Sequence, residues 1–114
     1  MSGLAYSAES KFPVVSLYTK EACTLCDEVK AVLARCREET PHSLELVDIT
    51  DDRDVWEAYK YDIPVVHVDG NYWTKHRLSE AEARSTLEEA AQDKLKGKPF
   101  QPRPGRPNAA AMEL

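Results

Sequence analysis

Hydrophobic residues follow two different spacings in the first part of the chain. Residues 12–18 form an almost continuous apolar run, which predicts a strand buried on both faces of a sheet. Residues 24–39 instead repeat apolar positions with the spacing of one helix face. These positions are Leu25, Val29, Val32, Leu33 and Cys36. The pattern therefore predicts a helix that ends before Thr40-Pro41.

The next two segments repeat this order of strand and helix. Leucines alternate with polar residues over residues 43–49, which predicts a second strand. Residues 52–60 follow as a short helix, because Thr50-Asp51-Asp52 offers N-cap side chains before Val55. A strand, a crossover helix and a second strand form a right-handed parallel unit in almost all proteins.

The last part of the patterned region predicts a hairpin and a closing helix. Residues 63–68 and 71–74 are strand-like and are separated by Asp69-Gly70, a common hairpin turn. Ser79-Glu80-Ala81-Glu82 is a capping box, so the last helix is expected at about residues 80–92. The order is β-α-β-α-β-β-α, which predicts an α/β fold with a four-stranded mixed sheet flanked by helices.

The patterned region ends before the chain does. We expect one domain over residues 12–93, preceded by a polar leader, residues 1–11. Residues 94–114 contain four prolines with basic residues and no periodicity, which predicts a disordered basic tail.

Charge divides the chain in the same way. Residues 1–93 carry 19 acidic and 10 basic side chains, whereas residues 94–114 carry 1 acidic and 5 basic side chains. An acidic folded part argues against binding to nucleic acid. Only the basic tail could favour a polyanion, and a solvated chain end is the simpler interpretation.

The sequence lacks the signals that would direct it to a membrane or out of the cell. No apolar stretch approaches the roughly 18 residues needed to span a bilayer. Residues 1–11 have neither the apolar segment of a secretory signal nor the Arg-rich character of a transit peptide. We therefore expect an intracellular protein, with the cytoplasm as its compartment and mitochondria left open. We also expect a monomer.

Two of the three cysteines, Cys23 and Cys26, lie where the first strand turns into the first helix. In a reducing compartment such a pair indicates catalysis or metal binding, not a structural bridge. A thiolate at a helix start is stabilised by unpaired N–H groups and the helix dipole, which lower its pKa by about a unit or less. Lys20 can add a positive charge, while Glu21 and neighbouring acids oppose the shift.

The spacing gives the two cysteines different expected roles. Cys23, at the boundary between turn and helix, is the candidate nucleophile. Cys26, one turn further in, can attack a mixed disulfide on Cys23 and release the product. The alternatives are a metal or iron–sulfur site and inert structural cysteines; zinc would need two further ligands, and neither His42 nor His67 has suitable spacing. Cys36 is expected in the core.

Three motifs in one order make the chain resemble a glutaredoxin-like protein of the thioredoxin-fold superfamily, over about residues 12–92. They are residues 17–26, Leu-Tyr-Thr-Lys-Glu-Ala-Cys-Thr-Leu-Cys; residues 47–50, Val-Asp-Ile-Thr; and residues 63–70, Ile-Pro-Val-Val-His-Val-Asp-Gly. The resemblance implies a thioredoxin-like fold and a divergent glutaredoxin-like branch.

The same resemblance implies further site residues. Pro64 is expected to follow a cis peptide bond and to face Cys23, and to leave the backbone of Ile63 free to pair with an extended substrate. Lys20 matches a lysine that helps hold glutathione. Two departures concern glutathione: Thr24-Leu25 replaces the usual Pro-Tyr, and residues 74–80 lack the usual Gly-Gly, so that N–H groups after Ser79, or basic side chains there, would have to bind its carboxylate.

The sequence therefore predicts a thiol–disulfide oxidoreductase that reduces protein or glutathione mixed disulfides. Cys23 and Cys26 are the expected catalytic residues, with Lys20, Ile63 and Pro64 in substrate binding and no metal site. The dithiol is the redox centre, so no organic cofactor is required, and glutathione is a possible reductant. The alternatives are an iron–sulfur or metal-binding module and a redox-silent adaptor of the same fold.

Overall fold

The structure is a computed structural model that describes residues 12–101. The predicted leader, residues 1–11, and residues 102–114 of the predicted tail lie outside the described residues. No helix within the described part is long and apolar enough to cross a membrane.

Four strands form one mixed sheet in the order β2-β1-β3-β4. The strands are β1 (Val14–Thr19), β2 (Ser43–Asp48), β3 (Val65–Val68) and β4 (Asn71–Lys75). β1 pairs with β2 in parallel, while β3 is antiparallel to both β1 and β4. The sheet confirms the mixed architecture predicted from the sequence.

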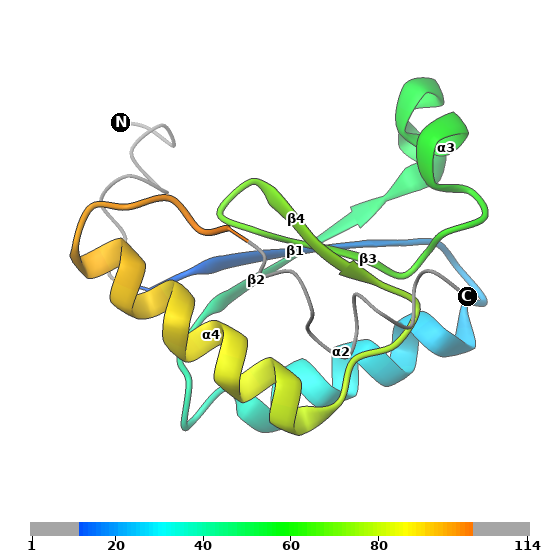
Figure 1. The fold of residues 1–114 in the computed structure, drawn as a ribbon. Coiled ribbons are helices and arrows are strands. Elements are labelled where there is room, and N and C mark those ends of the chain that lie inside the picture. The colour runs from blue at the N-terminus through cyan, green and yellow to red at the C-terminus, as the bar shows by residue number, and fades with distance from the viewer. Residues whose placement is uncertain (1–11, 102–114) are drawn as a thin grey trace.

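Three α-helices accompany the sheet: α2 (Thr24–Cys36), α3 (Arg53–Tyr59) and α4 (Glu80–Leu95). α2 and α4 lie together on one face, and α3 lies on the opposite face (Figure 1). A short 3₁₀ turn, η1 (Ile49–Asp51), precedes α3 and was not predicted. α2 ends at Cys36 and not at the predicted residue 39, because the Arg37 N–H donates to the Ala34 carbonyl oxygen at 3.3 Å, an i to i−3 bond that tightens the last turn.

The core lies between the sheet and the helix pair. Alternation along β1 directs Val15 and Leu17 to this side, and both are fully buried. The helices contribute the apolar face predicted for α2 and the small residues of α4. The cluster includes Val29, Leu33, Cys36, Val66, Val68, Ala83, Leu87 and Ala90. This packing fixes the direction of α2, and so the position of the cysteines at its start.

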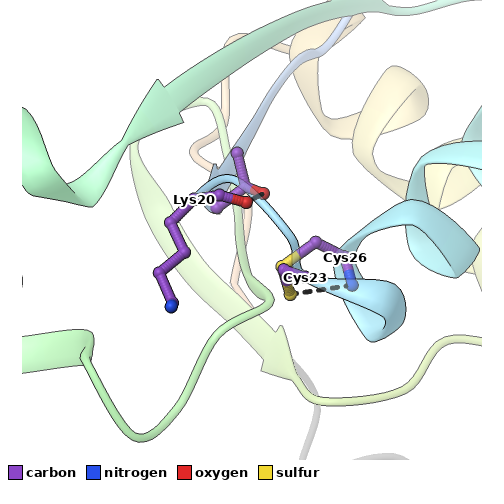
Figure 2. Close-up of a disulfide and its surroundings, with 4 residues drawn as sticks. Lys20, Cys23 and Cys26 are labelled. Carbon is purple, nitrogen blue, oxygen red and sulfur yellow. Dashed lines mark hydrogen bonds between the residues drawn. A yellow bond between two sulfur atoms is a disulfide. The ribbon is translucent and has the colours of Figure 1, made fainter.

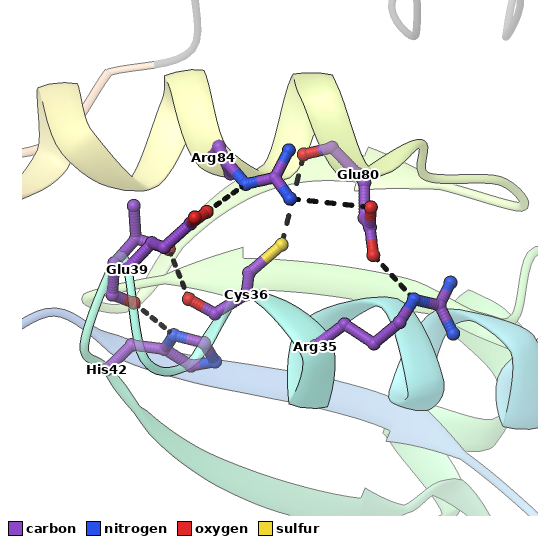
Figure 3. Close-up of polar contacts among 7 residues, drawn as sticks. Arg35, Cys36, Glu39, His42, Glu80 and Arg84 are labelled. Atoms are coloured by element: carbon purple, nitrogen blue, oxygen red, sulfur yellow. Dashed lines mark hydrogen bonds and ion pairs between the residues drawn. The ribbon is translucent and has the colours of Figure 1, made fainter.

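Charged side chains join α2 to α4 across their solvent side (Figure 3). Arg35 pairs with Glu80, and Arg84 pairs with both Glu39 and Glu80. The thiol of Cys36 lies beneath them and donates to the Glu80 carbonyl oxygen at 3.9 Å. Because the ion pairs are partly exposed, we expect them to help orient the two helices and to contribute little to the stability of the fold.

The packed part of the chain extends beyond the predicted boundary at residue 93. α4 continues to Leu95, and Phe100 is buried in the core, 4% exposed. The Asn71 amide donates to the Phe100 carbonyl oxygen at 3.1 Å. Asp69 accepts from the Val14 N–H at 2.9 Å and from the Lys94 ammonium at 3.1 Å. The expectation of disorder from residue 94 onward therefore does not hold for residues 94–101.

Candidate active site at the start of helix α2

The turn between β1 and α2 presents the first cysteine of the pair. Ala22 has a φ of 60°, in the left-handed region, and this bends the chain back toward the helix start. Cys23 is then the N-cap residue, with extended backbone angles, and α2 begins at Thr24. The sulfur of Cys23 thus occupies the place where a capping side chain meets the free N–H groups of the first turn.

The two cysteines form one local unit (Figure 2). The Cys26 N–H donates to the sulfur of Cys23 at 3.1 Å. The two sulfur atoms lie at disulfide distance, and the Cα atoms are 5.2 Å apart. An N–H that caps a sulfur atom stabilises the thiolate form more than the thiol. In the disulfide form that the structure holds, this N–H already points at the sulfur of Cys23.

Burial distinguishes the two sulfurs. Cys23 is half-buried, whereas Cys26 is 1% exposed. Of the two sulfurs, only that of Cys23 is therefore reachable from solvent.

Lys20 lies on the same turn, three residues before Cys23. Its side chain is exposed and extends away from the sulfur atoms (Figure 2). Among residues 12–101 it forms no ion pair. Its expected contribution is therefore a charge within reach of a substrate, and not a contact with the thiolate.

Pro64 lies at the same end of the sheet as the cysteine turn. Tyr18 is paired with Val65, so Pro64 lies level with Thr19, where β1 enters the turn. Pro64 is fully buried, and the Ile63-Pro64 peptide bond is cis. The Pro64 carbonyl oxygen accepts from the His76 N–H at 2.7 Å, which joins this segment to the loop after β4.

The prediction for the Ile63 backbone is wrong for its N–H group. The sequence led us to expect its backbone free for pairing with a substrate. In the structure its N–H donates to the Tyr59 carbonyl oxygen at 3.2 Å. The preceding helix α3 therefore already uses this donor, and a substrate strand has only the carbonyl oxygen of Ile63 to pair with.

The basic loop after β4 is the third segment near the cysteines. Lys75 pairs with Asp62 at 3.4 Å. His76 has a φ of 72°, and the Ser79 hydroxyl accepts from the Glu82 N–H at 3.1 Å as the N-cap of α4. Of the groups considered for a glutathione carboxylate, the Lys75 ammonium and, among the N–H groups after Ser79, that of Glu82 thus already have partners. Arg77 is exposed and forms no ion pair within the described part of the chain.

An aromatic group behind the site was not predicted as a unit. The Tyr59 hydroxyl lies 3.0 Å from His67 Nε2, and the Tyr18 ring lies 4.7 Å from the His67 ring. Burial lowers the pKa of His67, while a hydrogen bond with the Gly70 backbone acts in the opposite direction. The contacts connect α3 to β1 and β3. Alternation along the strands could have placed Tyr18 and His67 on one face, but not the contact with Tyr59.

The remaining candidates are structural. Cys36 is fully buried, and burial raises the pKa of its thiol. His42 is buried, with Nδ1 2.8 Å from the Thr40 carbonyl oxygen. Within residues 12–101 no three His, Cys, Asp or Glu side chains are grouped closely enough to hold a metal ion.

Fold and site together define a glutaredoxin-like protein with a thioredoxin-like fold and a Cys-x-x-Cys pair at a helix start. The family described as "Glutaredoxin-like domain (DUF836)" matches residues 14–88. This match covers more than half of the chain, so the chain belongs to that family.

Solved structures share this fold. Protein XcR50 from X. campestris is 27% identical, with a TM-score of 0.58, covering 67% of this chain and 97% of that one. Protein Ne2328 from Nitrosomonas europaea is 20% identical, with a TM-score of 0.61, covering 69% and 95%. A thioredoxin from Halobacterium salinarum is 16% identical, with a TM-score of 0.56, covering 78% and 83%, which supports the fold alone.

Proposed function

We propose that the protein is a thiol–disulfide oxidoreductase in which Cys23 is the nucleophile and Cys26 the resolving thiol. The observation that carries the proposal is the half-buried N-cap sulfur of Cys23, which accepts the Cys26 N–H at 3.1 Å, beside a Cys26 that is 1% exposed. These observations support a reduced form in which Cys23 is the stabilised and reachable thiolate and Cys26 stays protected until Cys23 has reacted.

The proposed reaction is the reduction of a disulfide by the dithiol. The Cys23 thiolate attacks one substrate sulfur, a mixed disulfide forms, and the first substrate thiolate leaves and takes a proton from solvent. Cys26 then loses its proton and attacks the Cys23 sulfur. The second substrate thiol leaves, and the Cys23–Cys26 disulfide remains, so that two electrons have passed to the substrate.

The pair is the proposed redox centre, and the proposal includes no organic cofactor. A further thiol compound must return the pair to the dithiol, and glutathione is the candidate. The proposed substrates are disulfide-containing proteins or glutathione mixed disulfides, met by a monomer in a reducing intracellular compartment. Pro64 and the Ile63 carbonyl are proposed to position the substrate beside Cys23, with Lys20 as a charged helper.

Reduction of a glutathionylated peptide by the wild type and two variants tests the proposal. Cys23→Ser should abolish the reaction, because no other exposed thiol is present in residues 12–101. Cys26→Ser should retain part of it, because glutathione can resolve the mixed disulfide on Cys23. The disulfide bond of a small protein substrate should be reduced only when both Cys23 and Cys26 are present.

The same assay can reject the proposal. If the fully reduced wild type leaves both substrates unchanged, or if Cys23→Ser is as active as the wild type, the assigned chemistry is wrong. A protein purified without oxygen that shows a visible iron–sulfur spectrum would instead support the metal-binding alternative.

A further inference from the structure

A groove lies between α2 and the loop that joins β4 to α4. Its floor consists of three buried apolar side chains, Val29, Val32 and Leu78. The volume is about 490 Å³, within the range of pockets that bind small ligands. The proposed chemistry of the cysteine pair does not use this groove.

Both walls of the groove are connected to the candidate active site. Val29 follows Cys23 by six residues, about 9 Å along the helix axis, a span that an extended residue and a long side chain can cover. The opposite wall begins at His76, whose N–H donates to the Pro64 carbonyl oxygen at 2.7 Å. A substrate whose cysteine reacts at Cys23 would therefore have its neighbouring residues close to this groove.

Arg77 and Glu28 place opposite charges on the two sides of the groove. Arg77 lies on the loop wall, is exposed, and has no ion pair within residues 12–101. Glu28 lies on the α2 wall, and Arg35, further along that wall, is paired with Glu80. An acidic group would thus be attracted to the loop wall and repelled by the start of the helix wall.

The loop conformation turns Arg77 toward the rim. His76, which precedes it, has a φ of 72°, a conformation that few residues other than glycine adopt. This backbone conformation costs free energy and persists only where the surrounding structure holds it. Residues of this kind are often found at binding sites. Here the Pro64 carbonyl holds the His76 backbone, so the bend is fixed by the segment that borders the cysteine pair.

We propose that this groove selects protein substrates by the residues next to the reactive cysteine. An apolar side chain fills the space above Val29, Val32 and Leu78, and an acidic side chain beyond it pairs with Arg77. The proposal rests on the proposed function, because the groove matters only if Cys23 reacts with a substrate disulfide. Arg77 acts as a specificity residue and takes no part in the sulfur exchange.

The test compares rate constants for the reduction of disulfide peptides by stoichiometric, pre-reduced protein. The peptides carry leucine next to the cysteine, followed by aspartate, serine or lysine; a fourth is glutathionylated and has serine at both positions. Bis(2-hydroxyethyl) disulfide, which has no flanking residues, reports the chemistry of the cysteine pair alone.

The wild type should reduce the aspartate peptide about fivefold faster than the lysine peptide, the size of one exposed charge pair. Arg77→Glu should reverse this preference, and added salt should weaken it. Arg37→Glu is the matched control, because it makes the same change of charge at an exposed arginine that does not line the groove. All three proteins should reduce bis(2-hydroxyethyl) disulfide at the same rate.

A second pair of variants tests the apolar part. Ala31→Phe fills the groove from an exposed position of α2, and Ala34→Phe adds the same ring one turn later, outside it. Only Ala31→Phe should slow the leucine peptides.

Three results would overturn the inference in distinguishable ways. If Arg77→Glu and Ala31→Phe behave as the wild type on every peptide, the groove has no role although the proposed function stands. If Arg77→Glu slows the glutathionylated peptide as much as the aspartate peptide, Arg77 recognises glutathione and not a flanking residue. If the wild type reduces neither peptides nor the small disulfide, the proposed function fails first.

Discussion

Single residues set the chemistry of this protein through where their backbone lies. Cys23 caps a helix, and Cys26 supplies the N–H that the cap requires. A side chain at this position meets unpaired donors and the positive end of the helix dipole without any charged partner. The third cysteine, Cys36, has none of these features, because it is the last residue of α2 and is fully buried.

We expect the three cysteines to differ in reactivity under native conditions. Iodoacetamide should modify Cys23 of the reduced protein first, because its sulfur is reachable and favoured as an anion. Cys36 should stay unmodified until the protein unfolds, since it is fully buried and burial raises the pKa of its thiol. Mass spectrometry of the alkylated peptides measures the order. Modification of Cys36 as early as Cys23 would contradict it.

His42 should make the stability depend on pH. It is buried, its Nδ1 faces the Thr40 carbonyl oxygen, and its Nε2 has no hydrogen-bond partner among residues 12–101. Burial lowers the pKa of this imidazole, with the Thr40 hydrogen bond opposing and Arg37 adding to the shift. The unfolded chain therefore binds the proton more tightly, so stability should fall as the pH decreases below about 6.5.

Urea unfolding of the wild type and His42→Gln between pH 8 and pH 5 measures this contribution. Glutamine can keep a donor toward Thr40 but does not titrate, so its curve should be flatter, by at most about 1.4 kcal/mol per pH unit. Some dependence should remain, because burial also lowers the pKa of His67. Two curves of equal slope would show that His42 does not titrate in this range.

The secondary-structure elements hold the site by packing more than by charge. α2 and α4 share the core cluster beneath the sheet, while their ion pairs lie at its solvent edge. Partly exposed ion pairs contribute about 0 to 1 kcal/mol each, whereas a buried leucine contributes several times more.

Leu87→Ala should therefore lower the free energy of unfolding by about 2 to 5 kcal/mol, because Leu87 is 1% exposed within the core of α4. Arg84→Leu, which removes the pairs with Glu39 and Glu80, should cost much less, because water screens these pairs. Denaturant unfolding of both variants gives the comparison. A larger loss for Arg84→Leu would mean that the charged contacts determine how the helices are held.

Contacts between the two ends of the described chain lie at the end of the sheet remote from the cysteines. Asp69, in the turn after β3, joins the start of β1 to the end of α4, and Asn71 holds the segment that carries Phe100. The C-terminal segment thus completes the core, and the folded unit is larger than the hydrophobic periodicity predicted.

Phe100→Ala should consequently destabilise the protein by about 3 kcal/mol, the low end for a buried aromatic residue, because a terminal segment can partly refill the space. The control is Leu95→Ala, 74% exposed, which should change stability by less than about 0.5 kcal/mol. Thermal or urea unfolding measures both. If the two variants have equal stability, Phe100 does not belong to the core.

The sequence predicted the features that depend on neighbours along the chain. Periodicity identified the strands and helices, and the spacing of Cys23 and Cys26 identified the start of α2. It missed the features that depend on distant contacts. Phe100 is surrounded by prolines and basic residues and has no local pattern, and the Ile63 N–H is used by Tyr59, which no spacing rule indicates. The groove beside Arg77 likewise requires two segments that meet only in the folded chain.

The most direct test is the pH dependence of the alkylation rate of Cys23 in the reduced protein, measured in Cys36→Ala so that one thiol fewer can react. We predict a half-maximal rate below about pH 8.5, the usual value for a free cysteine. This shift should become smaller when Cys26 is replaced by proline, which removes the capping N–H. A Cys23 that titrates like a free cysteine in both proteins would contradict the proposed role of this sulfur.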